Sequence, residues 1–353
     1  MSPSKLPALT GLRAFAALLV YVHHYNPFPK STFLHQLAQE GYVGVTVFFV
    51  LSSFLITWNY ADKLRTTEER KRFYLFRFAR ITPLYWLLLT GYYLLQWFTK
   101  GKADGLEQLS NFLLIKGLIP SQVFSGIPQS WSLTVEVCFY ALAPLWIFFV
   151  VERRWAALLL LYAFFGLGLV FFYKTALSFG SFYTLFGRFF EFGAGIYAAL
   201  WLYKKQEVSD FQFKTATALL FSSILVIAYV LAIHYFHLLA FYTEWLLYNL
   251  LLPIAVGFGL VGLATEKSLL ISVLSSSLFQ TLGKASYAFY LIHIGPVAIV
   301  LQRYVSDNNL VLLILLWGVA CGLYRWVERP VFKYLTGFSR KDAEEQRNIS
   351  DFQ

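Results

Sequence analysis

The segment WSLTVEVCFYALAPLWIFFVV, residues 131–151, carries one charged side chain, Glu136, in an otherwise mainly apolar stretch. A helix of about 20 mainly apolar residues is long enough to cross the hydrocarbon core of a bilayer. The composition agrees, because 58% of the 353 residues are hydrophobic and only 14% are charged, whereas a soluble domain carries about a quarter charged residues. The sequence therefore predicts an all-α polytopic membrane protein.

Apolar stretches of similar length recur along the chain, and we expect about ten transmembrane helices. The stretch 109–119 is also apolar, but it is short and contains Lys116, so we expect it to be re-entrant or interfacial. If it does span, there are eleven helices. The ten predicted spans are residues 9–26, 41–59, 81–99, 131–151, 155–174, 181–203, 214–236, 244–265, 283–302 and 309–327.

The placement of basic residues predicts the orientation of these helices. The net charge is +10, and the segment 61–80, ADKLRTTEERKRFYLFRFAR, is the most basic part of the chain. Basic loops tend to stay in the cytoplasm, so we expect both termini to be cytoplasmic in the plasma (inner) membrane. Residues 1–337 would form one transmembrane domain, and 338–353 a short polar, disordered tail. No aromatic-basic platform indicates binding of nucleic acid.

The cysteines and histidines indicate neither a disulfide framework nor a metal site. Cys138 and Cys321 both lie inside apolar stretches, and the six histidines include no His-x-x-x-His pair. We therefore expect chemistry that uses no metal.

Ionisable groups within apolar spans are costly and usually mark the functional interior of a membrane protein. Arg13 and His24 are eleven positions apart, roughly three helical turns, so they project from one helix face about 16 Å apart. A cation at one end and a base at the other suit a ligand with a phosphate head and a long arm, such as acyl-CoA. Alternatively, Arg13 snorkels to the headgroups and His24 is an interfacial histidine. The intramembrane set is Arg13, His24, Glu136, Arg188, Glu191, Lys284 and His293.

Four further features have a functional and a structural explanation. Arg77 and Arg80 share a helix face at spacing i, i+3 and suit phosphate oxygens, although positive-inside topology alone explains them better. Glu136 is predicted to orient and charge-stabilise a histidine as the third member of a triad; otherwise it is neutralised by burial or paired with a lysine.

Arg188 and Glu191 have the same i, i+3 spacing, and a structural ion pair is the better explanation for them. His293, close to Pro296, is either a second functional group or a polar link between helices. Lys284 and Ser132 complete the candidate site residues.

Seven motifs, in their order and wording, resemble the acyltransferase-3 family of membrane proteins, the O-antigen acetylase type. They run from Leu9 to about Tyr334 and so cover nearly the whole chain. One such motif is weak evidence, but seven in order are strong. The motifs are LTGLRAFAALLVYVHH (9–24), GYVGVTVFFVLSSFLIT (41–57), RFYLFRFARITPLYWL (72–87), SWSLTVEVCFYALAPL (130–145), GRFFEFGAGIY (187–197), LGKASYAFYLIH (282–293) and YRWVERPVFKY (324–334).

The resemblance implies a ten-helix fold that transfers an acyl group, usually acetyl, from acetyl-CoA or another acyl-CoA to a carbohydrate. By motif, it makes His24 the catalytic histidine and Arg13 its paired arginine. Arg77 and Arg80 become the cytoplasmic basic pair near the CoA phosphates, and Glu136 the acidic residue of the Trp-Ser-Leu motif.

The chain departs from the family pattern at a few positions. Thr46 stands where family members commonly have an acidic residue, and Ser53 where they have glycine. Val137 and Cys138 follow Glu136 where the family often has a second Glu and a Gln, so no carboxylate pair exists there. The sequence also ends soon after the last predicted span, so we do not expect the extracytoplasmic esterase-like domain of some relatives.

The sequence leaves several alternatives open. His24 can act as a general base or carry the acyl group covalently. The donor can be succinyl- or a longer acyl-CoA, and the acceptor a lipid-linked sugar, a polysaccharide or a glycoside. A transporter or flippase without acyl transfer is the rival class, since buried Arg, Glu and His also suit proton-coupled transport.

Overall fold

The computed structural model describes residues 6–101, 104–173, 180, 182–207, 217–235 and 247–337, and every regular element in these ranges is a helix. The predicted all-α class is therefore confirmed. The predicted tail, 338–353, lies outside the described residues, as do parts of the spans predicted at 155–174, 181–203, 214–236 and 244–265.

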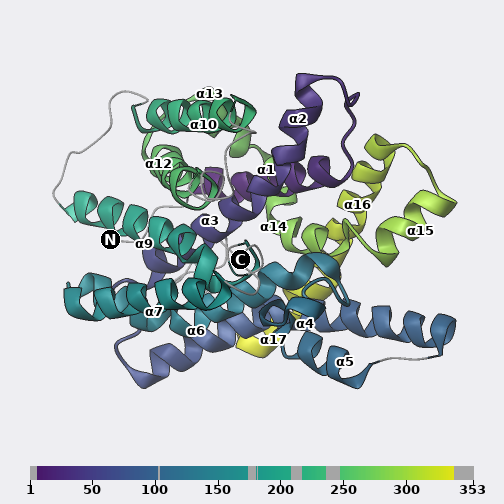
Figure 1. Ribbon diagram of the computed structural model, residues 1–353, viewed down its shortest axis with the longest axis horizontal. Coiled ribbons are helices and arrows are strands. Elements are labelled where there is room, and N and C mark those ends of the chain that lie inside the picture. Colours follow the sequence, from purple (N-terminus) through teal and green to yellow (C-terminus); the bar gives the residue numbers. More distant parts are fainter. Residues whose placement is uncertain are drawn as a thin grey trace.

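The helices form one bundle in which α1 and α3 pass through the centre, with α7, α9, α10 and α12 on one side and α14 to α16 on the other (Figure 1). Short π-helical turns, Leu247–Leu251 and Tyr324–Glu328, precede α12 and α17. The helices are α1 (Pro7–His24), α2 (Phe33–Gln39), α3 (Val43–Tyr60), α4 (Thr67–Lys100), α5 (Gly105–Phe112), α6 (Trp131–Val151), α7 (Trp155–Tyr173), α9 (Leu185–Glu207), α10 (Thr217–Tyr235), α12 (Leu252–Thr265), α13 (Leu269–Leu274), α14 (Ser277–Ile292), α15 (Pro296–Tyr304), α16 (Asn309–Leu323) and α17 (Arg329–Thr336).

Helix α4 begins well before the predicted span 81–99, because its first turn is capped. The Thr66 side chain accepts from the Glu69 amide while the Glu69 carboxylate accepts from the Thr66 amide. This capping box satisfies amides that a helix start otherwise leaves unpaired. The helix therefore extends through the basic segment and presents Arg77 and Arg80 on its way into the bundle.

Glycine allows the central helices to approach closely. A Cβ on Gly195 would overlap Ser53 Oγ and the Val50 carbonyl oxygen, and one on Gly283 would overlap the Thr10 carbonyl oxygen. Small residues at helix interfaces let backbones pack tightly in membrane proteins. The α3–α9 and α1–α14 contacts therefore depend on these two positions.

Four helical stretches are long and apolar enough to cross a membrane on their own: Phe33–Tyr60, Pro128–Val151, Leu247–Thr265 and Asn309–Thr336. The bent pair α14–α15 would make a fifth if it is one span. Most other predicted spans coincide with helices of the bundle. The count of ten and the cytoplasmic termini stay predictions.

Two local expectations have clear outcomes. The predicted span 283–302 is not one straight helix, because α14 and α15 meet at an angle of 89°. The break includes Gly295, whose φ of +97° favours glycine, and Pro296 starts α15. The stretch 109–119 is likewise broken, since α5 ends at Phe112 and a separate short turn follows at Lys116–Leu118.

Candidate active site

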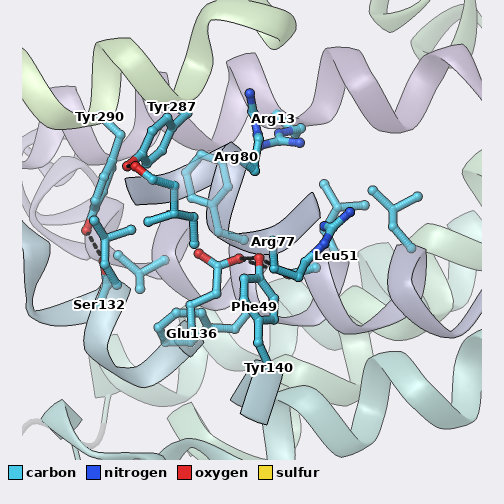
Figure 2. A pocket seen from close by; sticks show the side chains of 16 residues that line it. Arg13, Phe49, Leu51, Arg77, Arg80, Ser132, Glu136, Tyr140, Tyr287 and Tyr290 are labelled. Carbon is cyan, nitrogen blue, oxygen red and sulfur yellow. Dashed lines mark hydrogen bonds between the residues drawn. The ribbon is translucent and has the colours of Figure 1, made fainter. Parts of the chain in front are cut away.

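The first candidate cavity lies between α1, α3, α4, α6 and α14 and contains about 80 Å³ of open space. Three guanidinium groups line it, from Arg13, Arg77 and Arg80, together with the carboxylate of Glu136 (Figure 2). Arginine binds phosphate with two parallel hydrogen bonds. This arginine cavity is therefore suited to an anionic ligand with a slender arm.

Aromatic rings and acidic partners hold the arginines in place. Arg80 is buried, ion-paired with Glu328 of the turn before α17, and lies 5.5 Å from the ring centroid of Tyr287. Arg77 lies 5.7 Å from the ring centroid of Tyr140. The Glu136 carboxylate attracts the Arg13 guanidinium, whereas the like charge of Arg77 opposes it. Cation–π and ionic contacts thus keep the three groups around one space.

Glu136 is held within the arginine cavity. Its Oε1 accepts a hydrogen bond from Ser52 Oγ at 2.8 Å and from the Tyr140 hydroxyl at 2.5 Å. The predicted pairing of Glu136 with His24 is not formed, because the two side chains line different cavities. Glu136 is instead bonded to Ser52 and Tyr140, and His24 lies at the C-terminal end of α1.

The second candidate cavity is larger, about 470 Å³, and contains His24 at its wall. His23 lines it too, although its Nδ1 is engaged by the Gln39 carbonyl oxygen at 2.5 Å. His24 is exposed into this space. Most of the other lining side chains are aromatic: Tyr42, Phe124, Trp131, Phe182, Tyr183, Tyr248 and Tyr290.

A second imidazole, from His293, lies next to that of His24. The ring centroids of His24 and His293 are 5.4 Å apart, and His293 is fully buried. His293 Nδ1 donates to the Tyr290 carbonyl oxygen at 2.7 Å, since a carbonyl can only accept. Its Nε2 is buried and has no hydrogen-bond partner. The buried ring therefore keeps an unused polar atom next to His24.

Two side chains stabilise the break between α14 and α15, because the Tyr25 hydroxyl donates to the His293 carbonyl oxygen at 3.0 Å and Gln129 reaches three others. The Gln129 amide nitrogen lies 3.2, 2.8 and 3.3 Å from the carbonyl oxygens of Tyr290, Leu291 and Ile294. Carbonyls at a helix end need such partners. Non-helical backbone at membrane depth is tolerated where it is buried in protein or lines a cavity, and Ile294 does line the His24 cavity.

The two cavities meet at Val45 and Tyr290, which line both. The Tyr290 hydroxyl lies 2.9 Å from Ser132 Oγ, which faces the arginine cavity (Figure 2). Arg13 and His24 thus face two adjoining internal spaces. Neither side chain is turned towards lipid alone.

A family model described as an acyltransferase domain matches residues 6–324. The match covers most of the chain and includes both cavities. The chain belongs to the acyltransferase-3 family. No solved structure is similar enough to be counted as a match.

Three curated relatives of this family member carry names that state an acyl transfer. Acyltransferase MdmB of Streptomyces mycarofaciens is 35% identical over 43% of the chain and 42% of its own length. O-acetyltransferase OatA of Staphylococcus aureus strain MRSA252 is 26% identical over 99% of the chain and 61% of its own. Peptidoglycan O-acetyltransferase OatA of Listeria monocytogenes is 28% identical over 47% and 28%. The chain therefore spans less than two thirds of these relatives.

Thr46, one of the departures from the acyltransferase-3 pattern, belongs to a buried network. Its hydroxyl donates to Glu191 at 2.7 Å, and the same carboxylate oxygen accepts from Arg188 at 2.7 Å. The Arg188 guanidinium also lies 4.7 Å from the Tyr248 ring centroid and lines the His24 cavity. The ion pair favoured by the spacing is thus present, and it forms part of that cavity's wall.

Lys116 holds the loop that leads into α6. Its buried amine donates to the carbonyl oxygens of Ser125 and Ile127 at 2.5 and 2.6 Å. Burial lowers the pKa of this amine to about 7. The contact fixes the segment that carries Gln129. Lys284, by contrast, is half-buried and lines neither cavity.

Sequence reasoning missed several residues that shape the site. Gln129, Ser52, Tyr140 and Tyr290 are neutral, so a search for costly intramembrane charges passes over them. Glu328 lay within a quoted motif, YRWVERPVFKY, and its charge was the available signal. Its pairing with Arg80 depends on a long-range contact that no local spacing reveals.

Proposed function

We propose that this chain transfers an acyl group, most simply acetyl, from cytoplasmic acyl-CoA to a hydroxyl of a carbohydrate acceptor. The observation that carries the proposal is the junction at Val45 and Tyr290 of an arginine-lined cavity with a histidine-bearing one. One space suits the donor and the other the acceptor. The family membership and the names of the relatives support the reaction class.

The arginine cavity is assigned to the donor. Its three guanidinium groups favour phosphate, and Arg77 and Arg80 come from the basic segment predicted to face the cytoplasm. With about 80 Å³ of space, the cavity admits only the slim end of acyl-CoA. The adenosine therefore stays at the cytoplasmic mouth, the phosphates meet the guanidinium groups there, and the pantetheine arm carries the thioester inward.

His24 is assigned as the general base. Its imidazole takes the proton of the acceptor hydroxyl as that oxygen attacks the thioester carbonyl carbon. The tetrahedral intermediate collapses, the carbon–sulfur bond breaks, and the new oxygen ester forms. The proton on His24 passes to the departing CoA sulfur, so the products are the acylated acceptor and free CoA thiol.

A covalent route uses the same groups. The His24 imidazole attacks the thioester first and releases CoA thiol, and the acyl-imidazole is then attacked by the acceptor hydroxyl. In both routes the neighbouring His293 side chain supports the charge and orientation of His24. Glu136 is assigned to the donor side, where it orders Ser52 and Tyr140 beside the arginines.

The His24 cavity is assigned to the acceptor. Its space of about 470 Å³ falls within the usual range of small-ligand sites, about 300–1,000 Å³. Aromatic faces with a few polar groups, here Gln129 and Arg188, combine apolar contact with hydrogen bonding. That combination suits a sugar ring, which presents hydroxyls at its rim and C–H groups on its faces.

The experiment uses the full chain purified in detergent with acetyl-CoA and a glycan extract. Release of free CoA thiol that depends on the extract, together with acetylated glycan, supports the proposal. Acetyl-CoA that stays intact with every extract contradicts it. Parallel reactions with succinyl-CoA and a longer acyl-CoA separate the possible donors. The preferred donor is the one that most strongly suppresses transfer from the others when the thioesters are mixed.

A transporter remains the second candidate because α14 and α15 form an interrupted helix beside a cavity, a feature of many transporters. An assay with the protein reconstituted in proteoliposomes discriminates a transporter from an acyltransferase. A transporter moves the glycan across the vesicle membrane without consuming thioester, and an acyltransferase consumes thioester.

A further inference from the structure

A third space lies away from both catalytic cavities, in a groove bounded by the end of α6 and by α7, α9 and α12 (Figure 1). It contains about 810 Å³ and is lined almost entirely by apolar or aromatic side chains. Many of them are exposed, which is expected where a protein surface faces lipid. The exposed lining residues are Trp155, Phe190, Tyr197, Trp201, Leu250, Ile254 and Phe258.

Two cations line this groove, and both belong to the end predicted to face the cytoplasm. Arg153 follows the last turn of α6, and Lys204 lies near the end of α9. Trp155 and Trp201 accompany them, in the manner of the aromatic belts at membrane interfaces. The groove therefore has a positive, aromatic end and an apolar body.

The apolar body of the groove matches one leaflet in length. Along α9 this apolar lining runs from Phe190 to Trp201, before Lys204, and eleven residues of helix rise about 16 Å. One leaflet of the hydrocarbon core is about 15 Å deep, half of about 30 Å. An acyl chain that starts at the cationic end would thus fill the apolar body.

The backbone at Arg153 supports a role for its side chain. Its φ is +51°, the left-handed conformation that usually belongs to glycine after a helix. The amides of Arg153 and Arg154 bond to the carbonyls of Val150 and Phe149, as in a Schellman motif. A non-glycine residue in this conformation costs free energy, and arginine here places a cation in the groove.

We propose that this groove binds an anionic phospholipid of the cytoplasmic leaflet. Arg153 and Lys204 bind its phosphate, and the surface formed by α7, α9 and α12 holds its acyl chains. The occupant follows from charge complementarity and length, since cytoplasmic-leaflet anionic lipids attract basic residues at the membrane surface. The proposal is independent of the acyl-transfer chemistry.

The test uses the full chain purified in an uncharged detergent, with lipid binding followed by native mass spectrometry. Phosphatidylglycerol and phosphatidylcholine of identical acyl chains are titrated in parallel. The groove variant is Arg153→Gly with Lys204→Gln. The matched control is Arg154→Gln with Lys267→Gln, which removes the same charge from two exposed residues that do not line the groove.

We expect the unmodified chain to bind phosphatidylglycerol more tightly than phosphatidylcholine. Each groove cation removed weakens phosphatidylglycerol binding by about fivefold, so the double variant loses about 25-fold and the control keeps wild-type affinity. Arg153→Gly alone should leave the melting temperature unchanged or higher, because glycine suits the backbone there. Equal losses in groove and control variants would overturn the proposal. So would equal affinity for the two lipids, or a groove buried between two copies of the chain.

Discussion

The imidazole rings of His24 and His293 lie with their centroids 5.4 Å apart, where the C-terminal end of α1 meets the break between α14 and α15. His293 is fully buried and bonded through Nδ1, whereas His24 is exposed into the larger cavity. In the proposed mechanism the two rings have different tasks. His24 meets the substrate, and His293 acts only through His24.

His293→Gln should lower kcat with the acceptor by about tenfold, the loss expected for one supporting polar contact. The donor KM should stay unchanged, because His293 does not line the arginine cavity. Steady-state kinetics with each substrate varied in turn make the measurement. Tyr25→Phe is the comparison variant, because it removes a hydrogen bond to the His293 carbonyl at the same break but leaves the imidazole in place, and so measures the loss of backbone support alone. A rise in donor KM with unchanged kcat would contradict the positioning role.

Arg77→Gln should raise the KM for acyl-CoA by about tenfold to a hundredfold. A hydrogen bond to a charged group contributes about 1.5–3 kcal/mol, and glutamine cannot supply the cation. Arg72→Gln is the matched control, because Arg72 is an exposed residue of the same helix that does not line the cavity. If both variants change KM equally, the effect comes from general surface charge and the assignment of Arg77 to the donor is wrong.

Arg80 requires a paired design, because its buried partner Glu328 would be left as an unpaired charge. Arg80→Gln alone should destabilise the protein by about 3–5 kcal/mol. Adding Glu328→Gln should restore much of the melting temperature but leave the donor KM raised. Thermal unfolding in detergent and donor kinetics on the same samples give both readouts. A double variant with wild-type KM would show that Arg80 serves only the fold.

Gln129→Leu should lower stability by about 1–3 kcal/mol, because the carbonyls at the end of α14 lose their amide partner. Gly295→Ala should cost a similar amount through its left-handed backbone. Both changes act on the segment that holds His293, so activity should fall further than stability alone explains. Unfolding curves give the loss of stability, and turnover per folded molecule gives the loss of activity. Wild-type turnover per folded molecule in both variants would contradict a link between this segment and activity.

Composition and local spacing predicted the helical class, and the predicted intramembrane charged residues other than Lys284 line a cavity or are buried beside one. Arg13 and His24 share a helix, so their common face could be calculated from the helical repeat. The broken helix after α14 was missed, although His293, Gly295 and Pro296 supplied local signals. A break in a helix costs little free energy only if another segment bonds the backbone carbonyls that it leaves unpaired. Nothing in the local sequence indicates that Gln129 supplies such bonds.

The role expected for Glu136 failed for a related reason. A carboxylate and a histidine on different helices can be paired only when the axial levels of those helices are known. Those levels are set by packing between helices, which local sequence does not reveal. The structure instead gives Glu136 the partners Ser52 and Tyr140.

The central claim is that His24 carries out the transfer. The most direct test is mass spectrometry of surface glycans from cells that lack the protein and are supplied with the wild-type chain, His24→Ala or His23→Gln. General acid–base catalysis contributes about a hundredfold or more, so His24→Ala should abolish the mass increase of one acyl group at equal protein level, while His23→Gln should retain it. An undiminished acyl mass shift with His24→Ala would contradict the account.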